Sequence, residues 1–139
     1  TLFPHSSAGW SNLCNVWLRK AMKGDTDPFV DDLPIRRDPA KVRALDPLFR
    51  ERARDACQQA VQIDPNRAEA LTLLAVLARR DGFPDDAIEL AGRARQLDPA
   101  NPALHNNLGN AHASAEQWDL AVERYDAALE LEALWNERR

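Results

Sequence analysis

Apolar and small residues recur every three or four positions along most of the chain, which is the spacing of one face of an α-helix. In the C-terminal part, such a stripe is formed by Leu104, Leu108, Ala111 and Ala115. A short polar break at Glu116 and Gln117 follows it, and a second stripe then begins at Ala121. The pattern predicts two helices joined by a tight turn.

The helical pattern returns along the chain at a constant spacing. The segment Ile63-Asp64-Pro65 is matched by Leu97-Asp98-Pro99. The same spacing relates five further pairs, namely Leu74 to Leu108, Ala75 to Gly109, Ala87 to Ala121, Ala91 to Tyr125 and Ala94 to Ala128. Because a proline disfavours helical backbone in the residue before it, each Asp-Pro pair predicts the end of a helix.

An insertion interrupts the first helix pair. The N-terminal segment repeats the spacing of the later first helices, through Pro4, Trp10, Leu13, Cys14 and Trp17. The distance from Pro4 to Pro65 is nearly twice the distance from Pro65 to Pro99, so an insertion separates the two helices of this pair. We therefore expect helices at about 7–22 and 47–63, with the insertion at about 24–46.

This pattern resembles the tetratricopeptide repeat, a pair of helices over about 34 residues with small and aromatic residues at fixed places. The third repeat carries the resemblance most clearly, through Leu108, Gly109, Ala121, Tyr125 and Ala128. The resemblance implies an all-α, right-handed solenoid of about six or seven antiparallel helices. It implies one domain over residues 1–139, with repeat 1 at about 4–65, repeat 2 at about 66–99 and repeat 3 at about 100–135.

A solenoid of this family presents a concave groove, lined by the first helix of each repeat, to its partners. By resemblance, the groove residues are Asn12, Asn15, Arg79, Asn106, Asn107 and Asn110. An asparagine amide offers donors and an acceptor, so it can hold a peptide backbone whatever its side chains. The resemblance thus implies a protein-interaction module that binds another protein or a peptide. The insertion at about 24–46 is expected to cover this groove as a lid or to extend the interface.

The C-terminal end of the chain carries exposed apolar residues in the predicted solenoid. Ala133 replaces the closing proline, so we expect the last helix to continue towards Arg139. Leu131, Leu134 and Trp135 then have no following repeat to cover them. Such residues suggest a contact with a partner or with a second copy, so a homo-oligomer is a second expectation.

Composition narrows the range of functions. The 139 residues are 45% hydrophobic and 29% charged, with a net charge of −4. A mildly acidic chain without a basic stripe is not expected to bind nucleic acid, and no apolar run is long enough to insert into a membrane. The two cysteines, Cys14 and Cys57, are expected as separate buried thiols, with a disulfide between the two helices of repeat 1 as the alternative.

Residues with catalytic or metal-binding chemistry are few. His105 and His112 lie seven positions apart on one helix, about 10.5 Å along its axis, which is too far for one zinc ion. Asp25 and Asp27 resemble a short metal-binding motif but lack its structural context, so a solvated loop is expected. The sequence predicts no metal, no cofactor and no enzymatic activity.

Two other functions remain open on the sequence. The chain could be a regulatory or targeting segment of a larger enzyme, such as a glycosyltransferase or a sulfotransferase that carries such repeats. It could also be a scaffold that assembles through its exposed ends. The abundance of alanine, arginine and aspartate is typical of bacterial proteins from GC-rich genomes. The sequence does not establish the compartment, although it favours the cytoplasm.

Overall fold

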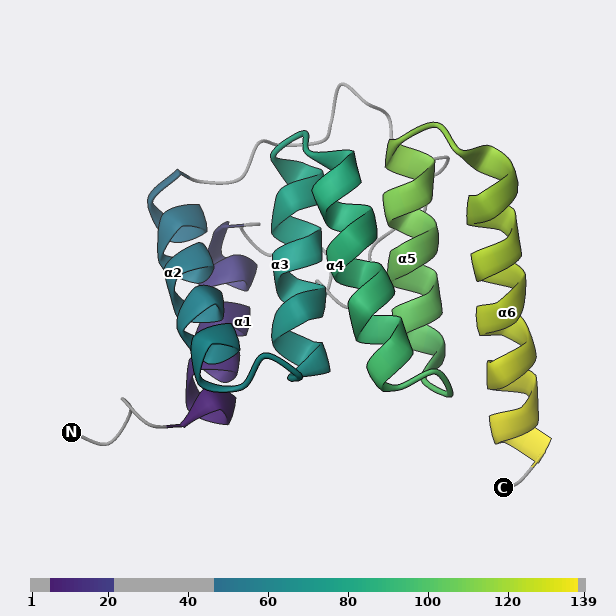
Figure 1. Ribbon diagram of the computed structural model, residues 1–139, viewed down its shortest axis with the longest axis horizontal. Helices are drawn as coiled ribbons and strands as arrows, with labels where there is room; N and C mark the ends of the chain where they lie inside the picture. Colours follow the sequence, from purple (N-terminus) through teal and green to yellow (C-terminus); the bar gives the residue numbers. More distant parts are fainter. Residues whose placement is uncertain (1–5, 22–46, 138–139) are drawn as a thin grey trace.

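The computed structural model describes residues 6–21 and 47–137, and within these residues it contains helices and no strand. The helices are α1 (Ser7–Ala21), α2 (Pro47–Ile63), α3 (Ala68–Arg80), α4 (Pro84–Leu97), α5 (Pro102–Ser114) and α6 (Trp118–Glu137). They stand side by side along the longest axis, with α1 and α2 at one end and α6 at the other (Figure 1). The expected all-α class is confirmed.

The helix bounds follow the spacing that the sequence predicts. The step from the start of α3 at Ala68 to the start of α5 at Pro102 equals the step from α4 at Pro84 to α6 at Trp118. The step from the start of α1 at Ser7 to the start of α3 at Ala68 is nearly twice as long. The helices expected at about 7–22 and 47–63 are therefore confirmed. The insertion expected at about 24–46 lies outside the described residues.

Turn chemistry explains where the helices begin and end. Prolines occupy the first positions of α4 and α5, where a missing N–H costs nothing. Asn101 caps α5 by accepting a hydrogen bond of 3.0 Å from the backbone N–H of Ala103. Gly82, after α3, has a φ of 86°, and Glu116, at the matching place after α5, has a φ of 61°. Both turns therefore need left-handed backbone, which glycine adopts freely and glutamate does not.

Replacing Glu116 by glycine should stabilise the protein. The substitution removes the steric cost of a left-handed non-glycine residue, and we expect a gain of about 0.5–1 kcal/mol in the free energy of unfolding. Urea unfolding monitored by circular dichroism measures this change. Glu116→Ala is the control, because it removes the same side chain and keeps a Cβ. An equal gain in both variants would assign the effect to the glutamate side chain rather than to the backbone.

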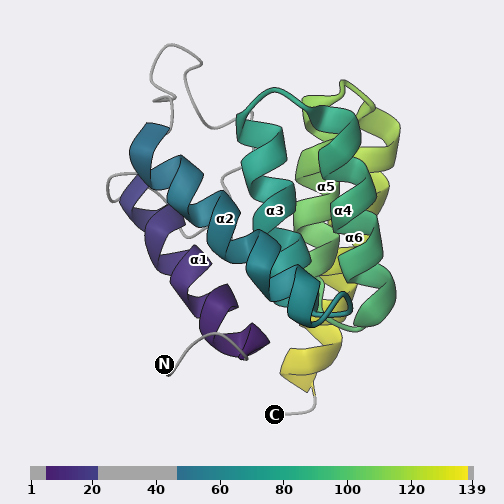
Figure 2. The same ribbon diagram turned by 60° about the vertical axis from the view of Figure 1, so that its left-hand side comes forward.

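Packing between helices divides them into two sets. Each helix contacts the next one along the chain, and the odd-numbered helices also contact each other, α1 with α3 and α3 with α5. Within the described residues, no Cα atom of α2, α4 or α6 lies within 8 Å of a Cα atom of another of these three helices. The views in Figures 1 and 2 show the same array of neighbouring helices from two sides.

Small side chains form much of the interior. The buried residues include alanines from α2, α3, α4, α5 and α6, which let neighbouring helices approach closely. One cluster joins α1, α2 and α3 through Leu18, Cys57 and Leu73, and another joins α3, α4 and α5 through Ala75, Ala91 and Leu108. Both clusters include residues of α3, and the backbone of α6 packs against that of α5.

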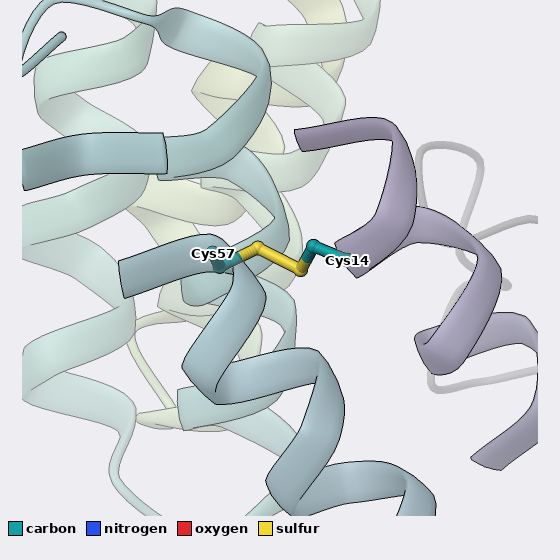
Figure 3. The surroundings of a disulfide bond; sticks show 2 residues. All are labelled: Cys14 and Cys57. Carbon is teal, nitrogen blue, oxygen red and sulfur yellow. A yellow bond between two sulfur atoms is a disulfide. The ribbon is translucent and has the colours of Figure 1, made fainter. Parts of the chain in front are cut away.

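A disulfide joins α1 to α2, so the expectation of two separate buried thiols is wrong. Cys14 and Cys57 are bonded, and their Cα atoms lie 5.2 Å apart (Figure 3). This separation is within the ordinary range for a disulfide. Both cysteines are fully buried, each one turn from other core residues of its helix. The bond closes a loop of 43 residues and fixes α1 against α2.

Polar contacts also tie the first helices to the rest. Ser7 donates a hydrogen bond of 2.9 Å to the Ala60 carbonyl and accepts one of 2.7 Å from Arg67 Nε. Asp81, at the end of α3, is paired with Arg50 and Arg54 of α2, and its distance to Arg50 is 3.2 Å. The Asp81 carboxylate is nearly buried, so two charged partners offset its lost hydration.

Candidate functional site

The predicted groove residues lie on the odd-numbered helices, which contact each other. α1 contributes Asn12, which is exposed, and Asn15, which is half-buried. The Asn15 side-chain oxygen accepts a hydrogen bond of 3.3 Å from Arg19 Nε, one turn further along α1. Because this contact is exposed and long, the Asn15 amide keeps most of its capacity to bind a ligand.

α5 contributes three asparagines that differ in burial. Asn106 is half-buried, whereas Asn107 and Asn110 are buried, with exposed fractions of 4% and 1%. Asn107 donates a hydrogen bond of 3.0 Å to the Ala103 carbonyl. Its amide thus contacts the backbone of its own helix, while the neighbouring Asn106 reaches the surface.

A polar cluster connects α3, α5 and α6. The Tyr125 hydroxyl donates a hydrogen bond of 2.6 Å to the Asn110 side-chain oxygen. The pKa of the Arg79 guanidinium is lowered to about 10, mainly by burial and further by the charge of Arg80. The interaction with Tyr125 raises this pKa and so opposes part of the shift. Burial raises the pKa of the Tyr125 phenol, and the Arg79 charge opposes that rise. The Tyr125 phenol is therefore hydrogen-bonded to the Asn110 amide and near enough to the Arg79 cation for their charges to interact.

The sequence did not single out Tyr125 as a member of this cluster. Tyr125 stands at the repeat position that Ala91 holds in the preceding repeat, and it appeared only as an aromatic of the helical pattern. Its ring lies against Gly109, where a Cβ would come within 2.6 Å of the ring carbon Cε1. In the sequence, the only indication of this contact was that the repeat pattern has an aromatic residue at Tyr125 and a small residue at Gly109.

α3 separates the asparagines of α1 from those of α5. Leu73, at the place that corresponds to Asn12 and Asn107, is fully buried in the core cluster of α1, α2 and α3. Thr72 is also buried, and its hydroxyl donates to the Ala68 carbonyl at 2.8 Å. Tyr125 thus links the two helices, since it is hydrogen-bonded to Asn110 and interacts electrostatically with Arg79, while Asn12 and Asn15 form a separate group on α1.

The predicted end residues lie together at an open cavity. Leu131, Leu134 and Trp135 of α6 face the turn between α4 and α5 across a space of about 550 Å³. The turn contributes Asp98 and Asn101. Leu134 and Trp135 are more than half exposed. These three residues therefore form one apolar surface beside a polar turn.

Further exposed apolar residues of α6 were not predicted as a surface. Trp118, Val122 and Leu129 are each more than half exposed. Their spacing of four and seven positions places them on one side of the helix, away from Ala121 and Ala128, which are buried. This spacing was present in the sequence, but only the packing of α6 against α5 shows which side is left open.

Both histidines form local hydrogen bonds. His105 is buried, and its Nε2 lies 2.8 Å from the Pro99 carbonyl. His112 Nδ1 lies 2.8 Å from the Gln117 side-chain oxygen. In the part of the chain that the structure describes, no three histidine, cysteine or acidic side chains gather as they would around a metal ion. Asp25 and Asp27 lie outside that part.

The chain matches no model of a known protein family, and a comparison with curated proteins gives no similar sequence. Over the described residues, every helix is too short or too polar to cross a membrane.

Proposed function

We propose that this protein is an interaction module of three tetratricopeptide-like repeats, which binds a peptide segment of another protein along the surface of α1, α3 and α5. The main supporting observation is that the backbones of α1 and α3, and of α3 and α5, approach within 8 Å between Cα atoms, whereas within the described residues those of α2, α4 and α6 do not. In a stacked array, the set of elements that lie closer together is on the inner side of the curve. This asymmetry supports a concave inner surface on α1, α3 and α5.

The repeat spacing supports the same proposal. Corresponding helices of the second and third pairs begin at the same distance from each other, Ala68 with Pro102 and Pro84 with Trp118. Gly109 receives the ring of Tyr125 where the repeat pattern places a small and an aromatic residue. A solenoid presents its inner surface to extended partners. Binding, rather than catalysis, is the function that such a surface supports.

The side chains on this surface favour a peptide backbone as the ligand. Asn15 and Asn106 are half-buried, so their amides are accessible and also partly fixed by packing. Each amide can donate to a peptide carbonyl and accept from a peptide N–H. Arg79 of α3 adds a positive charge between α1 and α5, which favours acidic side chains or carbonyl oxygens of a ligand.

A peptide-display selection followed by affinity measurements tests this function. Peptides enriched on the intact protein should bind the Asn15→Ala/Asn106→Ala variant about tenfold more weakly or worse, because two amide contacts are lost. Isothermal titration calorimetry gives the dissociation constants. The matched control is Gln59→Ala/Gln96→Ala, which removes two exposed amides from α2 and α4. Equal affinities in both variants would exclude binding through these asparagines.

We also propose that the protein works in an oxidising compartment, in place of the cytoplasm that the sequence favours. The supporting observation is the buried disulfide between Cys14 and Cys57. Structural disulfides form and persist in secreted, periplasmic and extracellular proteins, whereas cytosolic thiols are kept reduced. Trapping thiols with an alkylating reagent in intact cells, followed by mass spectrometry, distinguishes the two compartments.

A further inference from the structure

The two ends of the helical array carry opposite charges. α6 contains six acidic residues and one arginine, and its acidic side chains Glu123 and Glu130 are exposed. α1 contains no acidic residue and ends with Arg19 and Lys20, and α2 carries three arginines against two acidic residues, Glu51 and Asp55. α1 and α2 stand at one end of the long axis and α6 at the other, so the charges are separated along the molecule (Figure 1).

The end formed by α1 and α2 is both cationic and apolar. Leu13, Val16, Trp17 and Lys20 follow one another at helical spacing on α1, outside its buried stripe, and all are exposed or half-buried. The Trp17 ring stacks on Phe49 of α2 with 5.6 Å between ring centres. Lys20 Nζ lies 5.1 Å from the Trp17 ring and the Arg52 guanidinium lies 4.9 Å from it. This group is called the basic end.

The end formed by α6 is both acidic and apolar. Glu123 and Glu130 lie seven positions apart on the side opposite Ala121 and Ala128. Exposed apolar side chains flank this acidic row, namely Trp118, Val122 and Leu129 on one side and Leu120, Leu134 and Trp135 on the other. This group is called the acidic end. Several large exposed apolar residues on one helix are typical of a surface that contacts another protein.

We infer that copies of this chain associate head to tail, with the acidic end of one copy seated on the basic end of the next. Lys20 and Arg52 would face Glu123 and Glu130, while Leu13 and Val16 would cover the exposed apolar side chains of α6. Opposite charges favour this arrangement, and burial of apolar surface stabilises it. The contact is heterologous, so each added copy leaves one basic and one acidic end open, and the chain of copies does not close at a dimer.

The charges oppose the symmetric alternatives. Two α6 helices packed against each other would bring Glu123 and Glu130 of one copy near the same acidic residues of the other. Two basic ends packed together would oppose Lys20 and Arg52 in the same way. Like charges across an interface suppress such pairings. The inference is independent of peptide binding on α1, α3 and α5, since it uses the ends of the array.

Sedimentation velocity of the full chain tests the inference. At about 0.05 M salt, the weight-average sedimentation coefficient should rise with protein concentration without levelling at the value of a dimer, and at about 0.5 M salt it should fall. This measurement needs no substitution. A chain that stays monomeric at high concentration in low salt would overturn the inference.

Charge reversal identifies the two ends. A first variant, Lys20→Glu/Arg52→Glu, has two acidic ends, and a second variant, Glu123→Lys/Glu130→Lys, has two basic ends. Each alone should associate at least about tenfold more weakly than the unaltered chain, and an equimolar mixture should regain association because each variant supplies the end that the other lacks. The control Glu89→Lys/Arg93→Glu exchanges exposed charges in the middle of the array and should associate normally.

The variants, alone and mixed, distinguish head-to-tail association from the symmetric pairings. If the first variant alone still forms dimers, α6 pairs symmetrically and the inference is wrong. If the mixture of folded variants stays monomeric, the ends do not meet head to tail. Circular dichroism of each variant confirms that it is folded before its sedimentation is compared.

Discussion

Reduction of the Cys14–Cys57 disulfide is expected to lower the free energy of unfolding by about 4 kcal/mol, the largest effect predicted for this protein. The bond joins residues 43 positions apart, so its loss restores many conformations to the unfolded chain. Domains of this size are stable by about 5–15 kcal/mol, so this is a large share of the total. Thermal and urea unfolding with and without a phosphine reductant measure the change.

The variant Cys14→Ala/Cys57→Ala provides the control for the disulfide. It should be about as unstable as the reduced protein, and its unfolding midpoint should not respond to the reductant. The number of free thiols, measured by alkylation and mass spectrometry, establishes that the native protein has been reduced. An unchanged midpoint in fully reduced protein would contradict the prediction and assign the stability of the first helix pair to packing alone.

Gly109→Ala is expected to destabilise the protein by about 1–3 kcal/mol, although alanine is the better helix former. A Cβ at this position would lie 2.6 Å from Cε1 and 2.8 Å from Cδ1 of the Tyr125 ring. The ring is half-buried between α5 and α6 and bonded to Asn110, so it cannot withdraw without losing that hydrogen bond. Urea unfolding of the purified variant gives the change in free energy.

Gly92→Ala is the matched control for this prediction. Gly92 lies inside α4, and nothing is within 4 Å of an added Cβ, so the same substitution should stabilise the protein by up to about 1 kcal/mol. In a Tyr125→Ala background, Gly109→Ala should lose its penalty because the ring is absent. A similar gain in stability from both glycine substitutions would show that the contact between Gly109 and Tyr125 imposes no constraint.

Local features of the sequence were sufficient to predict the helices. Matching segments recur at a constant spacing, which nearly doubles in the first helix pair, and this indicated the starts of α1, α3 and α5. The pattern of apolar residues could be recognised because it is a property of each helix by itself. Prolines and polar breaks indicated the turns, including the break at Glu116 and Gln117. These signals involve residues close together in the chain, so they can be recognised without the structure.

The accessibility of the candidate site was not predictable in the same way. The sequence treats Asn106, Asn107 and Asn110 alike, but Asn107 and Asn110 are buried in the structure and Asn106 is half-buried. The reason is that burial depends on which neighbouring helices cover each side of α5. The hydrogen bond between Asn110 and Tyr125 depends on the same packing, because it joins residues of two different helices.

The sequence by itself determined the all-α class, the positions of the helices and the residue types available for binding. Only the tertiary structure decided that Cys14 and Cys57 are bonded and that the acidic α6 and the basic α1 stand at opposite ends. Helix formation follows from spacing and turn residues within short segments. Bond formation and surface charge instead depend on distances in space between residues far apart in the chain, and those distances are set by how the helices pack.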